Sequence, residues 1–264
     1  MSQGFDIKSK PIDLPSEGYF YPEDHPLADG VIEIRHMTAA DEDILTDRQL
    51  LKKGEAVDRL IDAVIVEEGV ELGDVLNGDV GGIMLATRIL AYGPQYPFEI
   101  ECPVCEEKNQ KVADLNEIEG KDVDFDSVEP HQTRFFTRLP VTDVEIGFKL
   151  LTRGDVQQVN KELKRSKRQS GRKTEKGLRP SGQVTTNMTT RLRRIIQEVN
   201  GETSKAEIRK FVEQMPARDS LYLRKEVEKL KPDIDLEYEF VCDHCGAFEL
   251  VDIPLDETFF FPTQ

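Results

Sequence analysis

The sequence predicts an α+β fold, in which helical segments and strand segments occupy different stretches of the chain. Three observations lead to this prediction. Apolar residues recur at helical spacing between residues 38 and 93. Beyond residue 95, short stretches alternate apolar and polar residues as strands do. Two CxxC pairs, Cys102 with Cys105 and Cys242 with Cys245, each lie between two of these strand-like stretches.

Length and composition limit the kinds of protein that this chain can be. Its 264 residues suffice for one large domain or two modest ones, and 38% hydrophobic residues suffice for a core. No apolar run approaches the roughly 20 residues that span a bilayer. Residues 1–6 show neither the basic nor the apolar segment of an export signal. We therefore expect reduced cysteines that bind a metal rather than form disulfides.

The net charge of −16 is unevenly distributed along the chain. Residues 1–130 carry 30 acidic against 11 basic side chains, a balance of −19, and residues 131–264 carry 21 against 24, a balance of +3. This distribution disfavours wrapping by nucleic acid. It fits docking to other proteins through complementary patches, although solubility alone accounts for it equally well.

Residues 1–37 are predicted to form an extended aromatic arm that ends in a short strand at 31–36. Between residues 14 and 22, Pro and Gly surround three aromatic side chains. Such a segment is irregular and needs a surface to pack on. We expect that surface to be the arm's own domain, and the alternative is a partner protein.

Residues 38–93 are predicted to form a helical unit. Thr38 is the expected N-cap of a first helix to about residue 51, with acidic residues in the first turn, where the helix dipole favours negative charge. A second helix is expected over 55–66. Asp79 is expected to cap a third helix, which Gly93 ends.

Residues 95–115 and 234–255 are predicted to form one discontinuous, zinc-ribbon-like β module made of two hairpins. Each hairpin carries one CxxC pair between its strands, which are expected at 96–100 and 110–113, and at 234–241 and 248–253. Two thiolates spaced i, i+3 in a tight turn present two sulfurs to one cation, and two such turns complete a tetrahedral site. The four predicted ligands of a Zn²⁺ ion are Cys102, Cys105, Cys242 and Cys245.

An ion bound by four thiolates has no open coordination position, so the predicted zinc is structural and not catalytic. His244 lies within the second pair and is an alternative ligand in place of a cysteine. The alternative to a shared site is two independent thiol pairs, one of them the dithiol of a thiol–disulfide oxidoreductase. A redox dithiol requires a thiolate at a helix N-terminus, whereas acidic or strand-like sequence follows each CxxC here.

Residues 130–232 are predicted to form a lobe inserted between the two hairpins, after an acidic linker at 116–130. Its expected elements, in order, are strands at 134–139 and 144–151, a helix at 154–164, and helices that start near residues 189, 203 and 216. A flexible basic stretch is expected at 161–183, with nine Lys or Arg in 161–179 and no apolar periodicity. An aromatic tail is expected at 256–264.

The basic stretch at 161–179 motivates an alternative function, that of a nucleic-acid-binding zinc-ribbon protein. No aromatic residues are interleaved there for base stacking, so a solvated loop, or one that orders against an acidic partner, accounts for it better. The sequence contains no phosphate-binding Gly loop with its Lys, no nucleophile elbow and no HExxH motif. We therefore predict no enzymatic reaction and no small-molecule substrate.

Short motifs follow one another in a set order along most of the chain. They are Leu14-Pro15-Ser16-x-Gly18-x-x-Tyr21, Met37-Thr38-Ala39-Ala40-Asp41-Glu42-Asp43-Ile44-Leu45, Tyr92-Gly93-Pro94 with Cys102-Pro103-x-Cys105, Met215-Pro216-Ala217-Arg218-Asp219, and Cys242-x-x-Cys245-Gly246 with Phe259-Phe260-Phe261-Pro262. In this order the chain resembles a family of tail proteins from T-even-like contractile-tailed phages. Members of that family are described as baseplate hub subunits or baseplate hub assembly chaperones.

The resemblance implies a non-enzymatic structural or assembly role in the central hub of a phage baseplate. Such a protein binds hub subunits or the subunits that initiate the tail tube, in the host cytoplasm during assembly, and then stays in the tail baseplate of the virion or leaves it. The basic stretch at 161–179 is an insertion relative to the family pattern, so the resemblance implies nothing for it. We expect the contact surfaces in the aromatic termini and the charged insert, and not at the zinc site.

Overall fold

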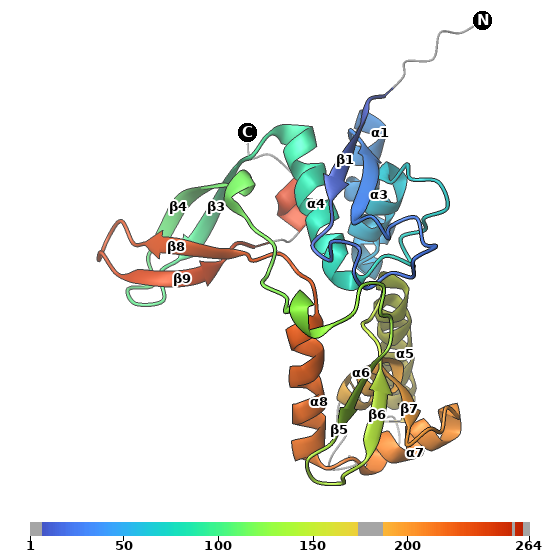
Figure 1. The fold of residues 1–264 in the computed structure, drawn as a ribbon. Helices are drawn as coiled ribbons and strands as arrows, with labels where there is room; N and C mark the ends of the chain where they lie inside the picture. Colours follow the sequence, from blue (N-terminus) through green and yellow to red (C-terminus); the bar gives the residue numbers. More distant parts are fainter. Residues whose placement is uncertain (1–6, 174–186, 255–256, 261–264) are drawn as a thin grey trace, which may run out of the picture.

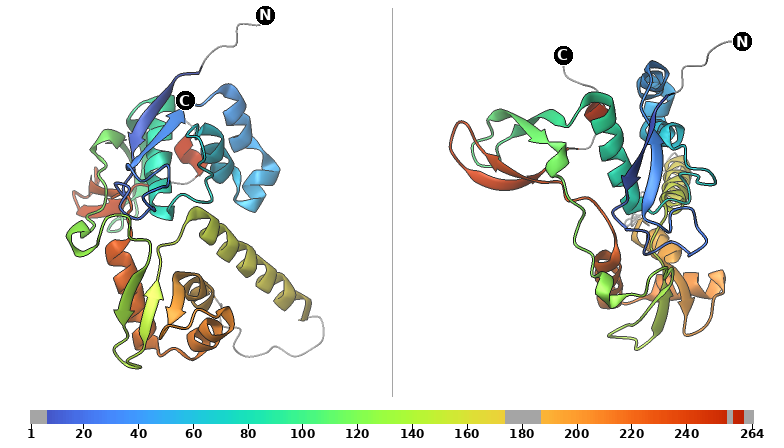
Figure 2. Two further views of the ribbon diagram at one scale, coloured as in Figure 1. Left: turned by 45° about the vertical axis from the view of Figure 1, so that its right-hand side comes forward. Right: turned by 45° about the horizontal axis from the view of Figure 1, so that its top comes forward.

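Helices and small antiparallel sheets occupy separate stretches of the chain in the computed structural model, which describes residues 7–173, 187–254 and 257–260 (Figure 1). This arrangement confirms the α+β prediction. The N-terminal region is helical, two hairpins project from it to one side, and a lobe of strands and helices lies below it in Figures 1 and 2.

The N-terminal arm contains a strand that the sequence pattern did not indicate. β1 (Ser9–Asp13) pairs antiparallel with β2 (Val31–Arg35), which the sequence predicts. The loop between them turns at Gly18, where φ is +79° and a Cβ would lie 2.1 Å from a backbone carbonyl oxygen, so only glycine fits. Phe20 and Tyr21 are 4% and 3% exposed. The arm therefore packs on its own domain, as expected, and does not offer these two aromatic side chains to a partner.

The helices that follow the arm are α1 (Ala39–Thr46), α2 (Arg48–Lys53), α3 (Ala56–Val64) and α4 (Asn77–Tyr92). Thr38 is the N-cap of α1 and Gly93 ends α4, both as predicted. The single helix predicted to follow Thr38 is instead two helices, because the Asp47 carboxylate accepts two N–H groups of the next turn and starts α2. The prediction that Asp79 caps the last helix is wrong. α4 begins two residues earlier, and the Asp79 side chain is buried within the fold.

Two β-hairpins carry the cysteine pairs, at the places the sequence predicts. β3 (Gln95–Glu101) pairs with β4 (Lys108–Asp114), and β8 (Glu237–Val241) pairs with β9 (Phe248–Asp252). Each hairpin is a separate two-stranded sheet. They pack against each other through Phe98 and Tyr238, whose rings meet edge to face with centroids 5.2 Å apart. Segments far apart in the sequence thus lie side by side in one module.

In its described residues, the inserted lobe consists of a three-stranded sheet and four helices, after two single-turn helices in the linker. The strand order in the sheet is β5 (Phe135–Arg138), β6 (Glu145–Phe148), β7 (Ile196–Val199). The helices are α5 (Arg153–Lys173), α6 (Asn187–Ile195), α7 (Lys205–Gln214) and α8 (Ala217–Leu230). The linker turns are η1 (Leu115–Glu117) and η2 (Phe125–Ser127).

Two predictions for the lobe are wrong. The helix predicted through residue 199 ends at Ile195, because the next four residues pair with β6 and form β7. The basic stretch predicted to be flexible from residue 161 is helical as far as Lys173. Lys, Arg, Glu and Gln are good helix formers, so a helix does not require an apolar stripe there. Residues 174–183 of that stretch lie outside the described residues.

The chain enters and leaves the lobe through two paired segments. The Lys121 N–H donates to the Asp233 carbonyl at 2.8 Å, and the Asp235 N–H donates to the Glu119 carbonyl at 2.9 Å. These bonds hold the entering and leaving segments together between the cysteine hairpins and the lobe.

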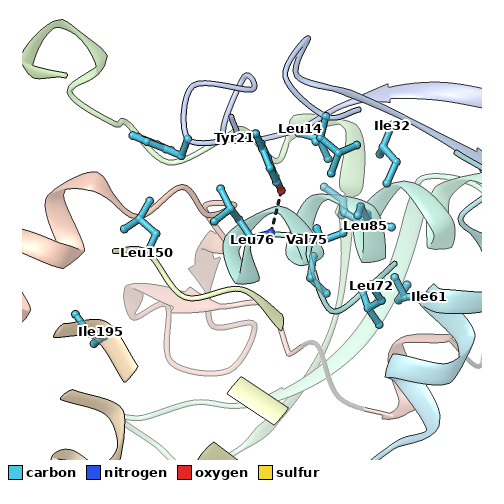
Figure 3. Packing of buried hydrophobic residues seen from close by; sticks show 14 of the residues in the cluster. Leu14, Tyr21, Ile32, Ile61, Leu72, Val75, Leu76, Leu85, Leu150 and Ile195 are labelled. Atoms are coloured by element: carbon cyan, nitrogen blue, oxygen red, sulfur yellow. Dashed lines mark hydrogen bonds between the residues drawn. The ribbon is translucent and has the colours of Figure 1, made fainter. Parts of the chain in front are cut away.

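One hydrophobic cluster connects the regions (Figure 3). It runs from Leu14 and Ile61 in the N-terminal region, through Leu76 beside α4, to Leu150 and Ile195 in the lobe. Within the part of the chain that the structure describes, none of the helices combines the length and the hydropathy needed to cross a bilayer.

The described part of the C-terminal tail packs inside the molecule. The short helix η3 (Glu257–Phe260) lies beside α4 (Figure 1), and Phe259 and Phe260 are both 0% exposed. The expectation that the aromatic termini are contact surfaces is therefore wrong for the described aromatic residues 20, 21, 259 and 260, because the core takes them up. Residues 255–256 and 261–264 of the predicted tail lie outside the described residues.

Candidate metal centre

Two turns of the same backbone form hold the cysteines, and we call residues 102–106 and 242–246 the first and second knuckle. In each, the N–H of the first cysteine donates to the carbonyl of the residue five positions later, at 2.9 Å in both knuckles. The N–H of the fifth residue donates back to the carbonyl of the first cysteine, at 2.9 and 3.0 Å. That fifth residue has a positive φ, +60° at Glu106 and +73° at Gly246. The two knuckles therefore present their sulfurs in the same way.

The structure brings all four predicted ligand residues together. The Sγ atom of Cys102 lies 3.7 Å from that of Cys245, and the Sγ atom of Cys105 lies 3.6 Å from that of Cys242. All four sulfurs lie within 4.8 Å of one another, and all four cysteines are free of disulfides. A tetrahedral zinc site with metal–sulfur bonds of about 2.3 Å has sulfur–sulfur edges of about 3.8 Å. The sulfurs are therefore spaced as donors around a single ion.

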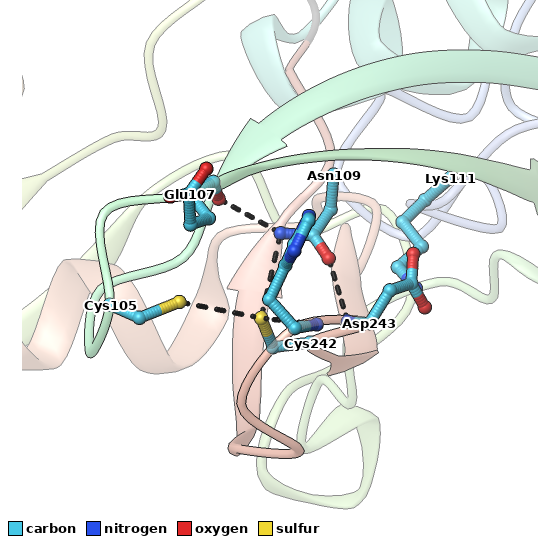
Figure 4. A network of polar contacts seen from close by, with 7 residues as sticks. Cys105, Glu107, Asn109, Lys111, Cys242 and Asp243 are labelled. Carbon is cyan, nitrogen blue, oxygen red and sulfur yellow. Dashed lines mark hydrogen bonds and ion pairs between the residues drawn. The ribbon is translucent and has the colours of Figure 1, made fainter.

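Asn109 of β4 connects the two knuckles (Figure 4). Its side chain is buried, and its amide nitrogen donates to the Glu107 carbonyl at 2.9 Å and lies 3.6 Å from the Cys242 sulfur. Its amide oxygen accepts the Asp243 N–H at 2.8 Å. Lys111 adds an ion pair to Asp243 at 2.5 Å. The sequence analysis did not identify Asn109. The signal that could have found it is an Asn at an inward position of a predicted strand, where Asn is disfavoured.

The thiols do not all hold their protons equally. The N–H groups of Cys245 and His244 point at the Cys242 sulfur and lower the pKa of that thiol to about 6, against the opposing effect of burial. At Cys105 the Glu107 N–H favours the thiolate, but desolvation and the protons shared with the other cysteines raise the pKa to about 12. Thiolates this close repel one another and cannot all ionise alone. A divalent cation among them removes that repulsion, because it deprotonates the thiols that it binds.

The donor set fits a metal ion. Thiolates are soft ligands that favour zinc, copper(I) or iron over magnesium and calcium. Four sulfurs fill a tetrahedral coordination sphere and leave no position for a substrate or a water. Asn109 supplies outer hydrogen bonds of the kind that orient such ligands, because its amide nitrogen donates toward the Cys242 sulfur and its amide oxygen accepts the Asp243 N–H. The four cysteines together can thus bind one ion.

His244 and the redox alternative gain no support from the geometry. Among the described residues, the closely spaced group of potential ligand atoms consists of the four cysteine sulfurs and does not include the His244 imidazole. His244 contributes its backbone N–H, 3.4 Å from the Cys242 sulfur. Neither knuckle precedes a helix, since β4 and β9 follow them. The helix N-terminus that activates a redox dithiol is therefore not at either CxxC pair.

A buried acid away from the cysteines, which the sequence predicted to be a helix cap, fixes the N-terminal arm. The Asp79 carboxylate is 0% exposed and accepts the Ser16 N–H at 2.9 Å, the Ser16 hydroxyl at 2.7 Å and the Tyr21 hydroxyl at 2.7 Å. The Tyr21 oxygen accepts the Leu76 N–H in turn. Burial raises the pKa of the Asp79 carboxyl to about 6, although the hydrogen bonds from Tyr21 and Ser16 oppose the shift. The first motif of the chain is thus explained by a buried contact.

Two further motifs are explained in the same way. Asp219, 0% exposed, accepts the Val141 N–H at 2.8 Å and the Thr142 hydroxyl at 2.8 Å, and so holds the β5–β6 turn against α8. Arg88, 2% exposed, donates to the Phe259 carbonyl at 2.9 Å. These side chains tie distant segments together, and none of them lies in an open cleft at the metal centre.

In a search against protein families, residues 19–260 match a family described as T4 bacteriophage base plate protein. No curated protein and no solved structure matches the chain. The matched range includes both knuckles, the whole lobe and η3.

Proposed function

The chain belongs to the family of T4 bacteriophage base plate proteins, and we propose that it is a non-enzymatic structural or assembly protein, a chaperone, of a baseplate hub. In this role it binds other hub or tail subunits and carries a structural zinc ion. The observation that carries the proposal is the family match, which covers residues 19–260 and so includes every described helix and strand except β1.

A zinc ion at the knuckles would act on the scaffold and not on a substrate. Cys102 and Cys105 precede the inserted lobe, and Cys242 and Cys245 follow it. One ion on all four sulfurs would therefore close the loop that contains the lobe. The paired segments at 119–121 and 233–235 close the same loop a second time. Such a double closure limits how the lobe moves relative to the hairpins, which suits a protein that presents fixed surfaces to neighbouring subunits.

Zinc is proposed over other soft metals because the site is closed and tetrahedral. Zinc has no redox chemistry and accepts four thiolates in structural sites. In small finger peptides a zinc ion contributes on the order of 10 kcal/mol of folding free energy. Two hairpins of five to seven residues per strand have little core of their own, so an ion contributes here what packing does not.

The nucleic-acid alternative is less well supported than the hub role. The basic helix α5 packs beside carboxylates of the N-terminal region, with the Arg153 guanidinium 2.5 Å from the Asp58 carboxylate. Lys161 and Lys164 line a groove that they share with Asp62 and Glu71. Acidic neighbours lower the positive potential that phosphate binding requires. Salt-dependent binding of DNA or RNA to the purified chain would revive this alternative, and no binding at low salt removes it.

Co-purification from infected cells tests the proposed function. A tagged chain, expressed during infection by the phage that encodes it, should recover baseplate hub or tail subunits. Infections in which the chain is absent should yield incomplete baseplates in electron micrographs. Recovery of the chain only as a free monomer, together with normal baseplates in its absence, contradicts the proposal. An infection with the untagged chain controls for proteins that bind the affinity resin.

A further inference from the structure

The outward face of the β8–β9 hairpin carries exposed apolar side chains next to one another. The directly opposed pairs on this face are Val241 with Phe248, Glu239 with Leu250, and Glu237 with Asp252. Val241, Phe248 and Leu250 are 50%, 58% and 56% exposed. Single exposed apolar residues are ordinary, but adjacent ones are typical of contact surfaces.

The other face of the same hairpin is already packed. Phe240 is 0% exposed and lies with Cys102 and Cys242 in a small cluster of its own. Tyr238, on the same side, meets the ring of Phe98. Because alternate side chains of a strand point to opposite faces, the packing of these residues leaves the outward face with no support from β3–β4.

Within the described part of the chain, the carboxylates on the outward face have no cationic partner. Glu237, Glu239 and Asp252 are exposed, and no ion pair joins any of them to another residue in the described ranges. Glu237 and Asp252 stand directly opposite each other. Like charges in opposed positions of a hairpin destabilise it. A partner that brings positive charge would relieve this repulsion.

In the β3–β4 hairpin, the carboxylate at the equivalent outward position is bonded by side chains of its own hairpin. There Glu99 binds Lys108 at 2.6 Å and Gln110 at 2.9 Å. Counted from the knuckles, Phe248 and Leu250 take the places of Lys108 and Gln110, and Glu239 takes the place of Glu99. The second hairpin has thus exchanged the partners of its central carboxylate for apolar side chains.

We propose that the outward face of β8–β9 docks a segment of another protein that carries apolar side chains between lysines or arginines. The apolar side chains would cover Val241, Phe248 and Leu250, and the cations would pair with Glu237, Glu239 and Asp252. A second copy of this chain meeting face to face is the wrong occupant, because it would bring the two sets of carboxylates together. That the partner is a tail subunit rests on the proposed function.

Site-specific photocross-linking tests this surface. A photoreactive amino acid replaces Phe248, which is 58% exposed, or, as the control, Val112, which is 56% exposed on the outward face of the other hairpin. Both tagged chains are recovered from infected cells, and mass spectrometry identifies the cross-linked segments. We expect position 248 to cross-link to an apolar, Lys/Arg-containing segment of another tail protein, and position 112 to give no such product.

Paired substitutions measure the two contributions. Phe248→Ser with Leu250→Ser removes the apolar contact, and Glu237→Lys with Glu239→Lys reverses the charge. Each pair should lower the recovered partner by at least about tenfold, since loss of a central contact commonly costs a factor of this size. Val112→Ser and Asp122→Lys with Asp126→Lys are the matched controls and should leave recovery unchanged. The substituted side chains are exposed, so the metal content should stay at the value of the unmodified chain and the thermal midpoint should not fall.

The failure of this inference differs from the failure of the proposed function. If the chain recovers tail subunits but position 248 cross-links to nothing, or to a second copy of the chain, the surface is wrong and the hub role stands. Unchanged recovery with both pairs of substitutions also overturns the surface. If the unmodified chain recovers no tail subunit, the proposed function fails and this inference fails with it.

Discussion

The two cysteine hairpins share one backbone plan. In both, the strand before the knuckle carries an aromatic residue four positions ahead of the first cysteine, Phe98 or Tyr238, and these two rings meet. In both, the turn closes with the same pair of hydrogen bonds and a fifth residue of positive φ. Their outward faces differ. Glu99 of the first hairpin binds its own neighbours, whereas Glu239 of the second stands beside exposed Phe248 and Leu250.

This difference separates the features that both hairpins share from those that only one of them has. The shared inward features hold the sulfurs in place and join the two hairpins. The outward side chains of β8–β9 contribute to neither of these in the described chain. We infer that the backbone repeat serves the metal centre and that the outward face of one hairpin serves a partner. The following substitutions test whether the two hairpins are equivalent at the metal centre and different on their outward faces.

The largest effect is expected at the equivalent last cysteines of the knuckles. Cys105→Ser and Cys245→Ser should each abolish metal binding, because three thiolates and a hydroxyl hold zinc far less tightly. The loss should approach the order of 10 kcal/mol found for small finger peptides, with a fall in the thermal midpoint of about 20 °C or more. Calorimetry and metal analysis measure both quantities.

Val104→Ala is the control for these cysteine variants, since Val104 lies in the first knuckle and is 63% exposed. It should keep the metal and the midpoint. A large loss in one cysteine variant and none in the other means that the pairs act independently, which contradicts a shared ion.

The next largest effect is expected at a position where the two hairpins differ inside the module. Asn109 and Glu249 both stand four positions after the last cysteine of their knuckle, but only Asn109 is buried and bonded across to the other hairpin. Asn109→Ala leaves the Asp243 N–H without its acceptor and should lower the free energy of unfolding by about 1–3 kcal/mol. Glu249→Ala should change it by less than about 0.5 kcal/mol. Equal effects in denaturant titrations would show that Asn109 does not connect the knuckles.

A smaller effect is expected at the fifth residue of each knuckle. Glu106 has φ +60°, where a residue with a Cβ is disfavoured by about 1–2 kcal/mol, part of which the flexibility of glycine in the unfolded chain offsets. Glu106→Gly should therefore stabilise the protein by up to about 1 kcal/mol. Gly246→Ala should destabilise it by about the same amount, although a Cβ there meets no atom within 4 Å. Changes of the same sign in both variants would mean that the two turns are not equivalent.

The smallest effect is expected from substitutions that give each hairpin an outward side chain like that of the other. Lys108→Ala removes the ion pair with Glu99 and should lower the free energy of unfolding only slightly, since the pair is exposed. Phe248→Lys gives Glu239 the neighbour that Glu99 has and should stabilise the isolated protein by a similar amount. If Phe248→Lys instead destabilises the isolated protein, the exposed ring has a role in the hairpin itself. Chemical denaturation at low salt detects both changes.

Local patterns in the sequence predict the elements whose causes are local. The alternation around the CxxC pairs predicts both hairpins, and Thr38 and Gly93 mark helix ends. The convergence of the four cysteines follows from their residue type and spacing. Features that depend on distant partners are not visible in this way. β7 forms only because β6 lies beside it, and the sequence around residues 196–199 continues a helical pattern.

The buried polar residues were missed for the same reason. In the sequence, Asp79 stands just before an apolar pattern of helical spacing, so the local pattern predicts a cap. Ser16 and Tyr21, about 60 residues away, instead donate hydrogen bonds to its carboxylate. Asn109 bonds to a turn more than 130 residues further along the chain. The aromatic termini were expected at a contact surface because no local signal distinguishes a buried aromatic run from an exposed one.

One zinc ion held by both knuckles is the central claim, and X-ray absorption spectroscopy with metal analysis tests it most directly. The purified chain should contain one zinc per molecule, with four sulfur ligands at about 2.3 Å and no nitrogen or oxygen ligand. Its four thiols should become reactive only after the metal is removed. A protein with no bound metal and oxidised cysteine pairs, or one with mixed sulfur and nitrogen ligands, would contradict the account.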